Sequence, residues 1–344
     1  METLPVDNVQ DFTSLKDISQ QYISPEIMPG DQVSIHESFE IPVIDMGKLT
    51  TDHVGYQNEM AKLYQASKEW GFFQLINHGA TTAIEKMKVV VEDFFKLPLE
   101  QKMVYAHQPN GVEGYGHVFA APSKILQWGD MLFLTSLPVS QRNLSLWPST
   151  PATFRSTCDE YSLEMDKISK GLIRVMATTL GVNPEILSSM YEDGTQAIRM
   201  NYYPPANENE KVTHPKAHRD TTGITLLVQI NEVNGLEIKK DNEWVLVKPI
   251  PGAIIINIGD IMEVMSNGEY SSIEHRTIVN FQKQRLSIAA FHSPNLSTKI
   301  GPLPNLSTKN GAKFKTIERE EYTRMLLTRK IGDEDILDQV KINQ

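Results

Sequence analysis

Three pairs of polar residues, each with one residue between its members, constrain this chain more than any other feature. The pairs are Asn201-x-Tyr203, His218-x-Asp220 and Arg285-x-Ser287. Side chains two positions apart point to the same face of a β-strand. If the pairs lie on strands, the fold brings an amide, a phenol, an imidazole, a carboxylate, a guanidinium and a hydroxyl into one interior.

The segments near these pairs are typical of buried strands. They read ITLLVQI at 224–230, AIIIN at 253–257 and RLSIAAF at 285–291. Turns rich in Asn, Gly and Asp, as at 233–235 and 240–242, separate the apolar segments. Many short strands with such turns predict a sandwich or a barrel.

His275 lies between the last two pairs and supplies a second imidazole. Two histidines and one carboxylate form the facial triad of non-haem Fe(II) oxygenases, which leaves coordination positions open. His218, Asp220 and His275 are therefore the predicted metal ligands. His214 would share an extended face with His218, but it lies in a turn interrupted by proline. We therefore expect His214 to be a surface or hydrogen-bonded core residue. We expect the same of the remaining histidines, which are His36, His53, His78, His107, His117 and His292.

Arg285 and Ser287 are predicted to bind an anion. A guanidinium offers a planar two-donor fork that matches a carboxylate, and the serine hydroxyl adds a third donor. An arginine that faced the interior without an anion would be an uncompensated buried charge, which is unfavourable by several kcal/mol. The alternative is a structural salt bridge between Arg285 and a nearby acid.

The overall composition narrows the class of protein. The 344 residues suffice for one large domain or two small ones. A net charge of −10 and a pI near 5.4 argue against nucleic acid or an anionic membrane as the main partner. The start of the chain lacks the features of a secretory signal, and no apolar run reaches the roughly 20 residues of a membrane span. We therefore expect a soluble, cytoplasmic protein, with the single Cys158 as a buried structural thiol.

Outside the strand-rich region the pattern is mainly helical. We expect a polar arm over 1–40, strands at 41–45 and 72–77, helices over 57–70 and 84–98, and an ordered loop-and-strand region over 106–150. A long helix is expected from about residue 160 to Gly181, followed by a helix with Asn183 as N-cap and Pro184 at its first position. A charged helical tail covers 316–340. The predicted regions are 1–150, 151–195, 196–300 and 301–344.

Eight segments from end to end of the chain resemble the plant 2-oxoglutarate- and Fe(II)-dependent dioxygenases. They are IPVIDMGKL (41–49), EWGFFQLINHG (69–79), EGYGHVF (113–119), RMNYYPP (199–205), HRDTTGITLLVQ (218–229), NIGDIMEVMSNGEY (257–270), HR (275–276) and RLSIAAF (285–291). The stretches GTQAIRMNYYPP and INEVNGLEIKK are most similar to the group that contains the poppy alkaloid O-demethylases. Two positions depart from the usual family pattern, Arg219 between the ligands and Ala206 in place of a cysteine. Neither is a predicted ligand.

The resemblance implies an α+β protein with a double-stranded β-helix (jelly-roll) core flanked by helices. It implies Fe(II) as cofactor, 2-oxoglutarate and O2 as co-substrates, and ascorbate in support. The implied reaction hydroxylates or O-demethylates a plant specialised metabolite (an alkaloid, flavonoid, coumarin or similar small molecule) and releases succinate and CO2. The expected protein is a monomer without nucleic-acid or membrane partners, and the sequence does not identify its substrate.

The same resemblance assigns roles to individual residues. Arg285 and Ser287 would bind the distal carboxylate of 2-oxoglutarate, with Tyr203 as a further donor and Asn201 near the metal. Phe291 shares a strand face with Arg285, at a position where relatives often carry an aromatic residue against a planar substrate. Plain core packing is the alternative for Phe291. Tyr115, Phe119 and Phe133 are expected to complete the substrate pocket.

Arg219 alternates with two ligands, so its side chain should point away from them. It either pairs with an acid on the outer face or reaches round the barrel mouth to the substrate.

Other function classes fit only part of the pattern. A member of the fold without turnover, acting as a binding protein, would have no need to keep the triad together with Arg285. A zinc hydrolase with the same ligands would have no use for Arg285-x-Ser287. A halogenase of this fold would lack the carboxylate, whereas Asp220 is present.

Overall fold

The structure is a computed structural model that describes residues 40–50, 53–108, 111–117, 128–206, 217–306, 311–328 and 335–342. The expected arm before residue 40 lies outside the described residues, as do Phe119, His36 and His214.

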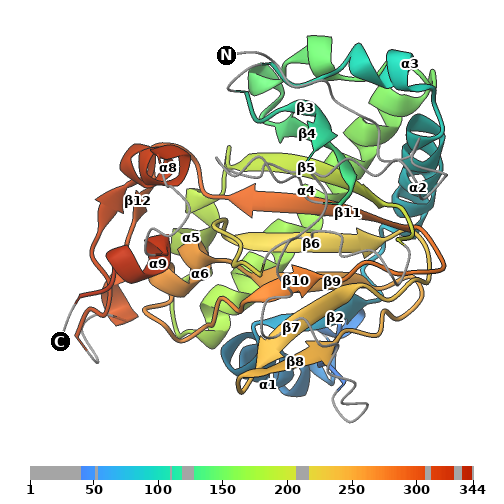
Figure 1. Ribbon diagram of the computed structural model, residues 1–344. Helices are drawn as coiled ribbons and strands as arrows, with labels where there is room; N and C mark the ends of the chain where they lie inside the picture. Colours follow the sequence, from blue (N-terminus) through green and yellow to red (C-terminus); the bar gives the residue numbers. More distant parts are fainter. Residues whose placement is uncertain are drawn as a thin grey trace.

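One mixed sheet of eight strands forms the larger layer, in the order β1-β2-β9-β6-β11-β5-β4-β3 (Figure 1). Its centre is an antiparallel set of strands: β9 (Ile254–Ile258), β6 (Ile224–Gln229), β11 (Arg285–Ser293) and β5 (Thr195–Tyr203). Strands from the first half of the chain extend both sides of this centre: β1 (Val43–Asp45) and β2 (Phe72–Ile76) on one side, β4 (Asp130–Leu137) and β3 (Gly114–His117) on the other. The N-terminal half therefore belongs to the same folded body as the centre.

A second, antiparallel sheet faces one side of the first. It consists of β10 (His275–Thr277), β7 (Leu236–Lys240) and β8 (Glu243–Leu246). Its apolar side chains, among them Ile238 and Val245, pack in one buried cluster with Phe72 and Ile255 of the large sheet. Two facing sheets flanked by helices confirm the predicted α+β jelly roll.

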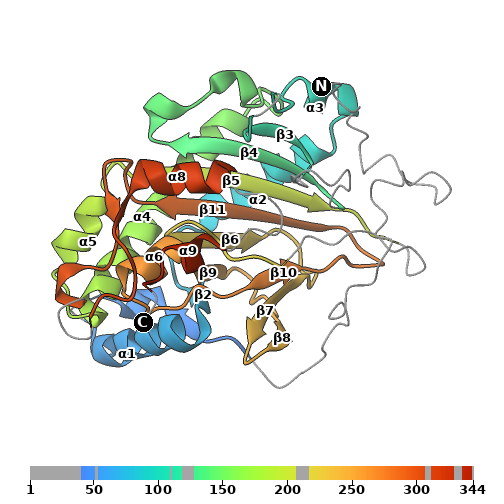
Figure 2. The same cartoon turned by 60° about the vertical axis from the view of Figure 1, so that its left-hand side comes forward.

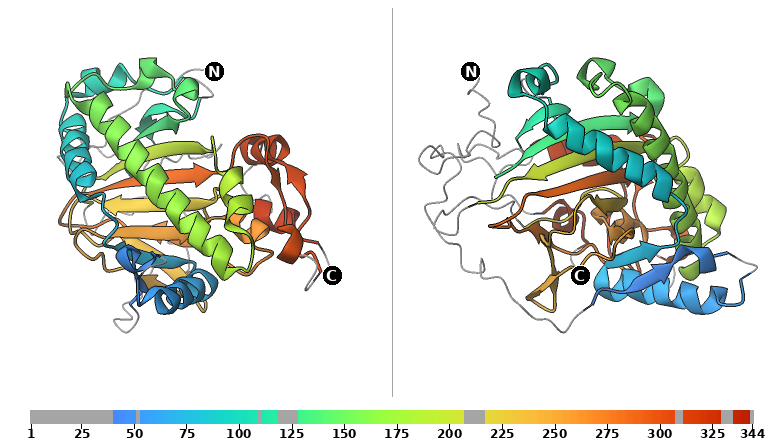
Figure 3. Two further views of the ribbon diagram at one scale, coloured as in Figure 1. Left: turned by 180° about the vertical axis from the view of Figure 1, so that it is seen from behind. Right: turned by 90° about the vertical axis from the view of Figure 1, so that its right-hand side faces the viewer.

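The outer face of the large sheet is covered by α4 (Phe154–Thr179), with α2 (Thr81–Phe95) beside it (Figure 3). Buried residues of α4, such as Leu172 and Met176, belong to the main core together with Leu226 and Ile288 of the sheet. The helix begins at Phe154, earlier than expected, because Phe154 and Thr157 already continue its buried face. Cys158 lies on that face and is fully buried, as predicted.

Further short helices surround this body. They are α1 (Tyr56–Gln65), a π-helical turn (Ala66–Trp70), α3 (Leu99–Met103), α5 (Pro184–Met190) and α6 (Asp260–Met265), with 3₁₀ turns at Met46–Lys48, Val139–Gln141 and Leu144–Leu146. The predicted start of α5 is confirmed, since the Asn183 side chain accepts a hydrogen bond from the Glu185 N–H at 3.0 Å.

The C-terminal segment is less helical than expected. It contains β12 (Lys299–Ile300) paired with β13 (Ile317–Glu318), then α8 (Arg319–Thr328) and α9 (Ile336–Gln339). These elements lie together beside α6 (Figure 2). Among the described helices, none has the length and apolar character that a membrane crossing requires.

Candidate metal centre and co-substrate pocket

His218 and His275 are neighbours on adjacent chain segments. Each backbone N–H donates to the carbonyl of the other at 2.9 Å, which forms a single antiparallel bridge. Asp220 Oδ1 lies 3.7 Å from Nε2 of each histidine. One ligand atom from each of the three residues lies within 4.8 Å of the others. These three atoms converge as the donor set of one metal ion would.

The prediction that His218-x-Asp220 lies on a strand is wrong beyond His218. The segment after the bridge leaves the small sheet. The carbonyl of Asp220 instead accepts the N–H of Asp260 at 2.8 Å, and the carbonyl of Thr222 accepts that of Ile261 at 3.1 Å. N–H groups of the first turn of α6 thus donate hydrogen bonds to the carbonyls of this segment. Asp220 reaches the histidines from a loop.

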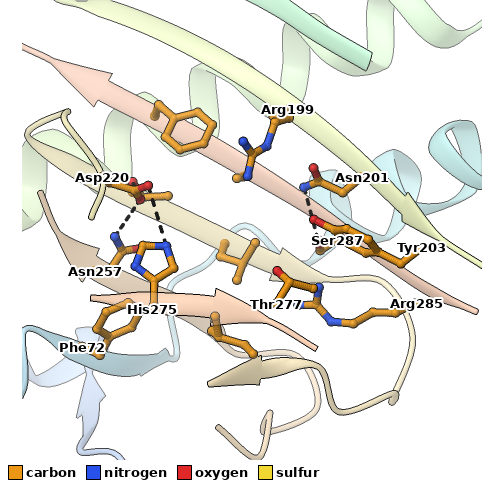
Figure 4. Close-up of a pocket in the computed structure, with 15 residues that line it drawn as sticks. Phe72, Arg199, Asn201, Tyr203, Asp220, Asn257, His275, Thr277, Arg285 and Ser287 are labelled. Atoms are coloured by element: carbon orange, nitrogen blue, oxygen red, sulfur yellow. Dashed lines mark hydrogen bonds and ion pairs between the residues drawn. The ribbon is translucent and has the colours of Figure 1, made fainter. Parts of the chain in front are cut away.

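The second oxygen of Asp220 is held by two neighbours in the large sheet. Thr225 Oγ1 donates to Oδ2 at 2.6 Å and Asn257 Nδ2 donates to it at 2.8 Å. Thr225 and Asn257 are cross-strand partners on β6 and β9. Because both donors act on Oδ2, Oδ1 remains directed at the two imidazoles. Figure 4 shows Asp220 between Asn257 and His275.

The charge state of Asp220 follows from the same contacts. Burial raises the pKa of this carboxyl, but His275, His218 and the two hydrogen bonds to Oδ2 oppose that effect and hold the pKa below its ordinary value. Asp220 is therefore a carboxylate at neutral pH. An anionic oxygen between two imidazoles suits a divalent transition-metal ion.

His275 is oriented by contacts on both sides of its ring. Its Nδ1 lies 3.2 Å from the carbonyl oxygen of Ile273, so Nδ1–H donates there and Nε2 keeps its lone pair for a metal. The Phe72 ring meets the imidazole edge to face, with centroids 5.3 Å apart. The side chain of His218 is 39% exposed, so the centre opens to solvent on that side.

Arg285 lies at the other end of the same pocket and is only 2% exposed. One of its nitrogens donates to Gln229 Oε1 at 3.4 Å, whereas Nε finds no partner among the described residues. No carboxylate within the described part of the chain forms an ion pair with it, so those residues offer no support for the salt-bridge alternative. Burial lowers the pKa of Arg285, and Tyr203 opposes that shift. Arg285 is a buried cation with an unused donor.

Strand register explains why the other predicted anion-binding groups surround Arg285. On β5 and β11, Tyr203 pairs with Arg285 and Asn201 pairs with Ser287. Asn201 Nδ2 donates to Ser287 Oγ at 3.4 Å, and the guanidinium carbon of Arg285 lies 5.6 Å from the centroid of the Tyr203 ring. The structure therefore brings together all four residues that the sequence predicted at this end.

A glycine makes room for the arginine. A Cβ at Gly235 would lie 2.4 Å from Cδ and 2.8 Å from Nε of Arg285. Carbon atoms in ordinary contact are about 3.5–4.0 Å apart. The turn before β7 thus approaches the arginine stem more closely than any other residue type permits.

The pocket extends from Asp220 to Arg285 between the two sheets (Figure 4). Besides the residues already described, its wall includes Leu227, Leu236, Thr277, Ala289, Phe291 and Arg199. The alternation of Arg285, Ser287, Ala289 and Phe291 along one face of β11 is as predicted.

The residues expected to bind the substrate are divided between this pocket and the core. The ring of Phe133 lies 6.4 Å from that of Phe291, which lines the pocket. Tyr115 does not line it, which corrects the expectation. Its ring is fully buried in the main core, and its hydroxyl donates to Asp130 Oδ2 at 3.0 Å. Phe119 lies outside the described residues.

Arg219 points away from the pocket. Its Nη1 lies 3.4 Å from Asp335 Oδ2, just before α9. This contact matches the outer-face alternative of the sequence prediction.

Three polar residues of the site were missed in the sequence. Asn257 is the single polar residue of the apolar segment AIIIN. Thr225 is a polar residue five positions after Asp220, within the apolar segment ITLLVQI. Arg199 precedes Asn201 by two, which continues the Asn201-x-Tyr203 alternation by one step. Period-two spacing would have identified Arg199, while isolated polarity in an apolar strand was the signal for Asn257.

Two family models match the chain. The 2OG-Fe(II) oxygenase superfamily matches residues 194–294, and the N-terminal region of non-haem dioxygenases in morphine synthesis matches residues 41–150. S-norcoclaurine synthase 1 of Coptis japonica is 46% identical over 350 residues, which covers 99% of this chain and 97% of that protein. The chain belongs to the 2-oxoglutarate- and Fe(II)-dependent oxygenases.

Other relatives agree with this assignment. Codeine O-demethylase of Papaver somniferum is 37% identical to the oxygenase over 348 residues, covering 98% of this chain and 97% of that protein. The crystal structure of JOX2 in complex with 2OG, Fe and JA superposes with a TM-score of 0.86 at 32% identity and covers 99% of both chains. The protein is thus an Fe(II)- and 2-oxoglutarate-dependent oxidoreductase of plant specialised metabolism, and the predicted resemblance is confirmed.

Proposed function

We propose that this oxygenase hydroxylates or O-demethylates a small aromatic metabolite (an alkaloid, flavonoid, coumarin or similar compound) and releases succinate and CO2. The metal ligands are His218, Asp220 and His275. The groups that bind 2-oxoglutarate are Arg285, Ser287, Tyr203 and Asn201. One observation carries the proposal: three convergent ligand atoms lie at one end of a pocket, and at the other end lies a buried arginine that no described acid pairs with.

The donor set fits both groups. Two imidazole nitrogens and one carboxylate oxygen leave a divalent ion with net positive charge and open coordination positions. The guanidinium fork of Arg285 and the Ser287 hydroxyl would bind the distal carboxylate of the dianion 2-oxoglutarate. When bound, the iron and 2-oxoglutarate activate O2 and supply the oxidising power that removes hydrogen from a C–H bond.

The chain itself provides position, charge and exclusion of water. Thr225 and Asn257 fix the Asp220 carboxylate, and Ile273 fixes the tautomer of His275. The apolar side chains of Leu227 and Phe291 form the wall of the pocket where the substrate would react, which is called the reacting region. They exclude water from it.

Hydroxylation and O-demethylation share this chemistry. Oxygen inserted into an O-methyl group gives a hemiacetal, which collapses to formaldehyde and a free hydroxyl. The similarity to codeine O-demethylase supports this outcome for the present chain.

A substrate screen tests the proposal. The iron-loaded protein is incubated with methoxylated alkaloids, flavonoids and coumarins, and succinate is measured with and without 2-oxoglutarate. Product mass separates the outcomes, because demethylation removes one methylene and hydroxylation adds one oxygen atom. If iron and 2-oxoglutarate bind but no compound and no background reaction releases succinate, the protein is the silent binding protein of the alternative interpretation.

A further inference from the structure

Arg199 introduces a second guanidinium into the pocket. It lies on β5 two residues before Asn201, so both side chains enter from the same face of the strand (Figure 4). Its cross-strand neighbours are Ala289 on β11 and Phe133 on β4. The guanidinium carbon lies 5.5 Å from the centroid of the Phe291 ring. Arg199 thus stands beside the apolar wall of the reacting region.

No described acid neutralises Arg199. Its Nε is buried and has no hydrogen-bond partner. Arg276, in contrast, pairs with buried Glu237 at 2.7 Å, and Arg142 pairs with Asp159. A buried donor without an acceptor is unfavourable by about 1–3 kcal/mol. Within the described part of the chain, the Arg199 guanidinium thus lacks an anionic acceptor, which a ligand carboxylate would supply.

A count of charges shows what that acceptor must carry. A divalent ion with Asp220 has one net positive charge, and Arg285 adds a second. The two negative charges of 2-oxoglutarate balance these two. The charge of Arg199 then has no counterpart among the described residues that line the pocket.

The position of Arg199 separates it from the co-substrate carboxylate. Ser287 and Asn201 form one cross-strand pair, whereas Ala289 and Arg199 form the next pair of that face, farther from Arg285. Phe291 lies one further step along β11. Arg199 therefore belongs to the side of the pocket where Phe291 presents its ring.

We propose that Arg199 binds a carboxylate of the primary substrate, so that the oxygenase acts on an aromatic carboxylic acid. The guanidinium binds the carboxylate in a two-donor pair, while Phe291 and Phe133 contact the ring. The inference rests on the proposed function, because the charge count assumes bound iron and 2-oxoglutarate. It narrows the substrate class from small aromatic metabolites to those that carry an acid.

Matched pairs of acids and esters test this. The probes are benzoic acid, cinnamic acid and 4-methoxycinnamic acid, each with its methyl ester. Their dissociation constants are measured by calorimetry on protein loaded with Fe(II) and 2-oxoglutarate under anaerobic conditions. We expect at least one acid to bind about tenfold or more tightly than its ester, which is the contribution of a charge-assisted pair.

Two variants locate the effect. Arg199→Met keeps an apolar stem against Phe291 and should reduce the preference for the acid to within about twofold, while Arg199→Lys retains an intermediate preference. Arg174→Met removes a guanidinium from the outer surface, where Arg174 pairs with Glu185, and should leave the preference unchanged. Melting temperatures of all variants establish that they are folded.

Three outcomes would overturn the inference. In the first, no acid binds more tightly than its ester. In the second, Arg199→Met weakens acid and ester equally, which makes Arg199 a packing partner of Phe291. In the third, the variant weakens 2-oxoglutarate as much as the acid, which assigns Arg199 to the co-substrate. Wild-type binding of iron and 2-oxoglutarate, measured separately, tells failure of the proposed function from failure of the Arg199 inference.

Discussion

Gly235→Ala should impair the use of 2-oxoglutarate although residue 235 donates no side-chain atom to the pocket. The added Cβ would lie 2.4 Å from Cδ of Arg285 and 3.1 Å from the carbonyl oxygen of Ile278. Because the carbonyl belongs to the backbone, the arginine stem is the part that moves. To restore an ordinary carbon–carbon contact, Cδ of Arg285 must move away from the new Cβ by about 1 Å or more.

That displacement sets the size of the effect. A guanidinium–carboxylate pair at about 2.8 Å loses most of its strength when its two donors shift by 1 Å. Such charge-assisted pairs contribute about 1.5–3 kcal/mol. The Michaelis constant for 2-oxoglutarate should therefore rise by roughly 10- to 150-fold, comparable with the effect of Arg285→Lys, which removes the planar fork.

The assay is succinate release against 2-oxoglutarate concentration at saturating iron. Gly171→Ala is the matched control, because a Cβ there meets only the flexible end of Met46 at 3.2 Å and lies within α4. It should leave the Michaelis constant unchanged. A folded Gly235→Ala protein with a wild-type Michaelis constant would refute both the steric argument and the assignment of Arg285 to the co-substrate.

Three further perturbations test other parts of the molecule. Asp220→Ala and His275→Ala should each lose bound iron and turnover while circular dichroism stays native, and activity in either variant would contradict the ligand set. Phe291→Leu should weaken substrate binding by up to about tenfold and change the melting temperature by only a few degrees, whereas a collapse of stability with normal binding would assign Phe291 to the core. Burial lowers the pKa of His292 to about 3, below its value of about 6.5 in the unfolded chain. Its contribution to stability is complete above pH 6.5 and is lost as pH falls toward 3, by about 2 kcal/mol at pH 5. Denaturant unfolding at pH 7 and pH 5 should show a smaller difference for His292→Gln, and an unchanged difference would exclude this residue as the cause.

Period-two alternation predicted the part of the site that lies on regular strands. The strands β5 and β11 are paired neighbours, and their register places four predicted residues side by side: Asn201, Tyr203, Arg285 and Ser287. Residues two apart in sequence are therefore also close in the structure. The same rule failed for Asp220, since its backbone bonds to α6 and not to a strand.

Contacts between distant segments were beyond the reach of local patterns. Tyr115 lies in an aromatic-rich region, and nothing in its neighbourhood distinguishes a pocket residue from a core residue. Its burial depends on the packing of Phe94 against its ring and on the hydroxyl contact with Asp130. Gly235 likewise reads as an ordinary turn residue, and its closeness to Arg285 follows only from the stacking of the two sheets.

The placement of early strands on both sides of a later centre has a consequence for how the chain is synthesised. Phe72 of β2 pairs with Asn257 of β9, and Phe133 of β4 pairs with Arg199 of β5. When β1 to β4 leave the ribosome, the strands that separate them in the finished sheet have not yet been translated. Exposed strand edges promote association between chains, and pairings between residues far apart in sequence form slowly. The first strands therefore keep unpaired edges until β5, β6, β9 and β11 have been translated.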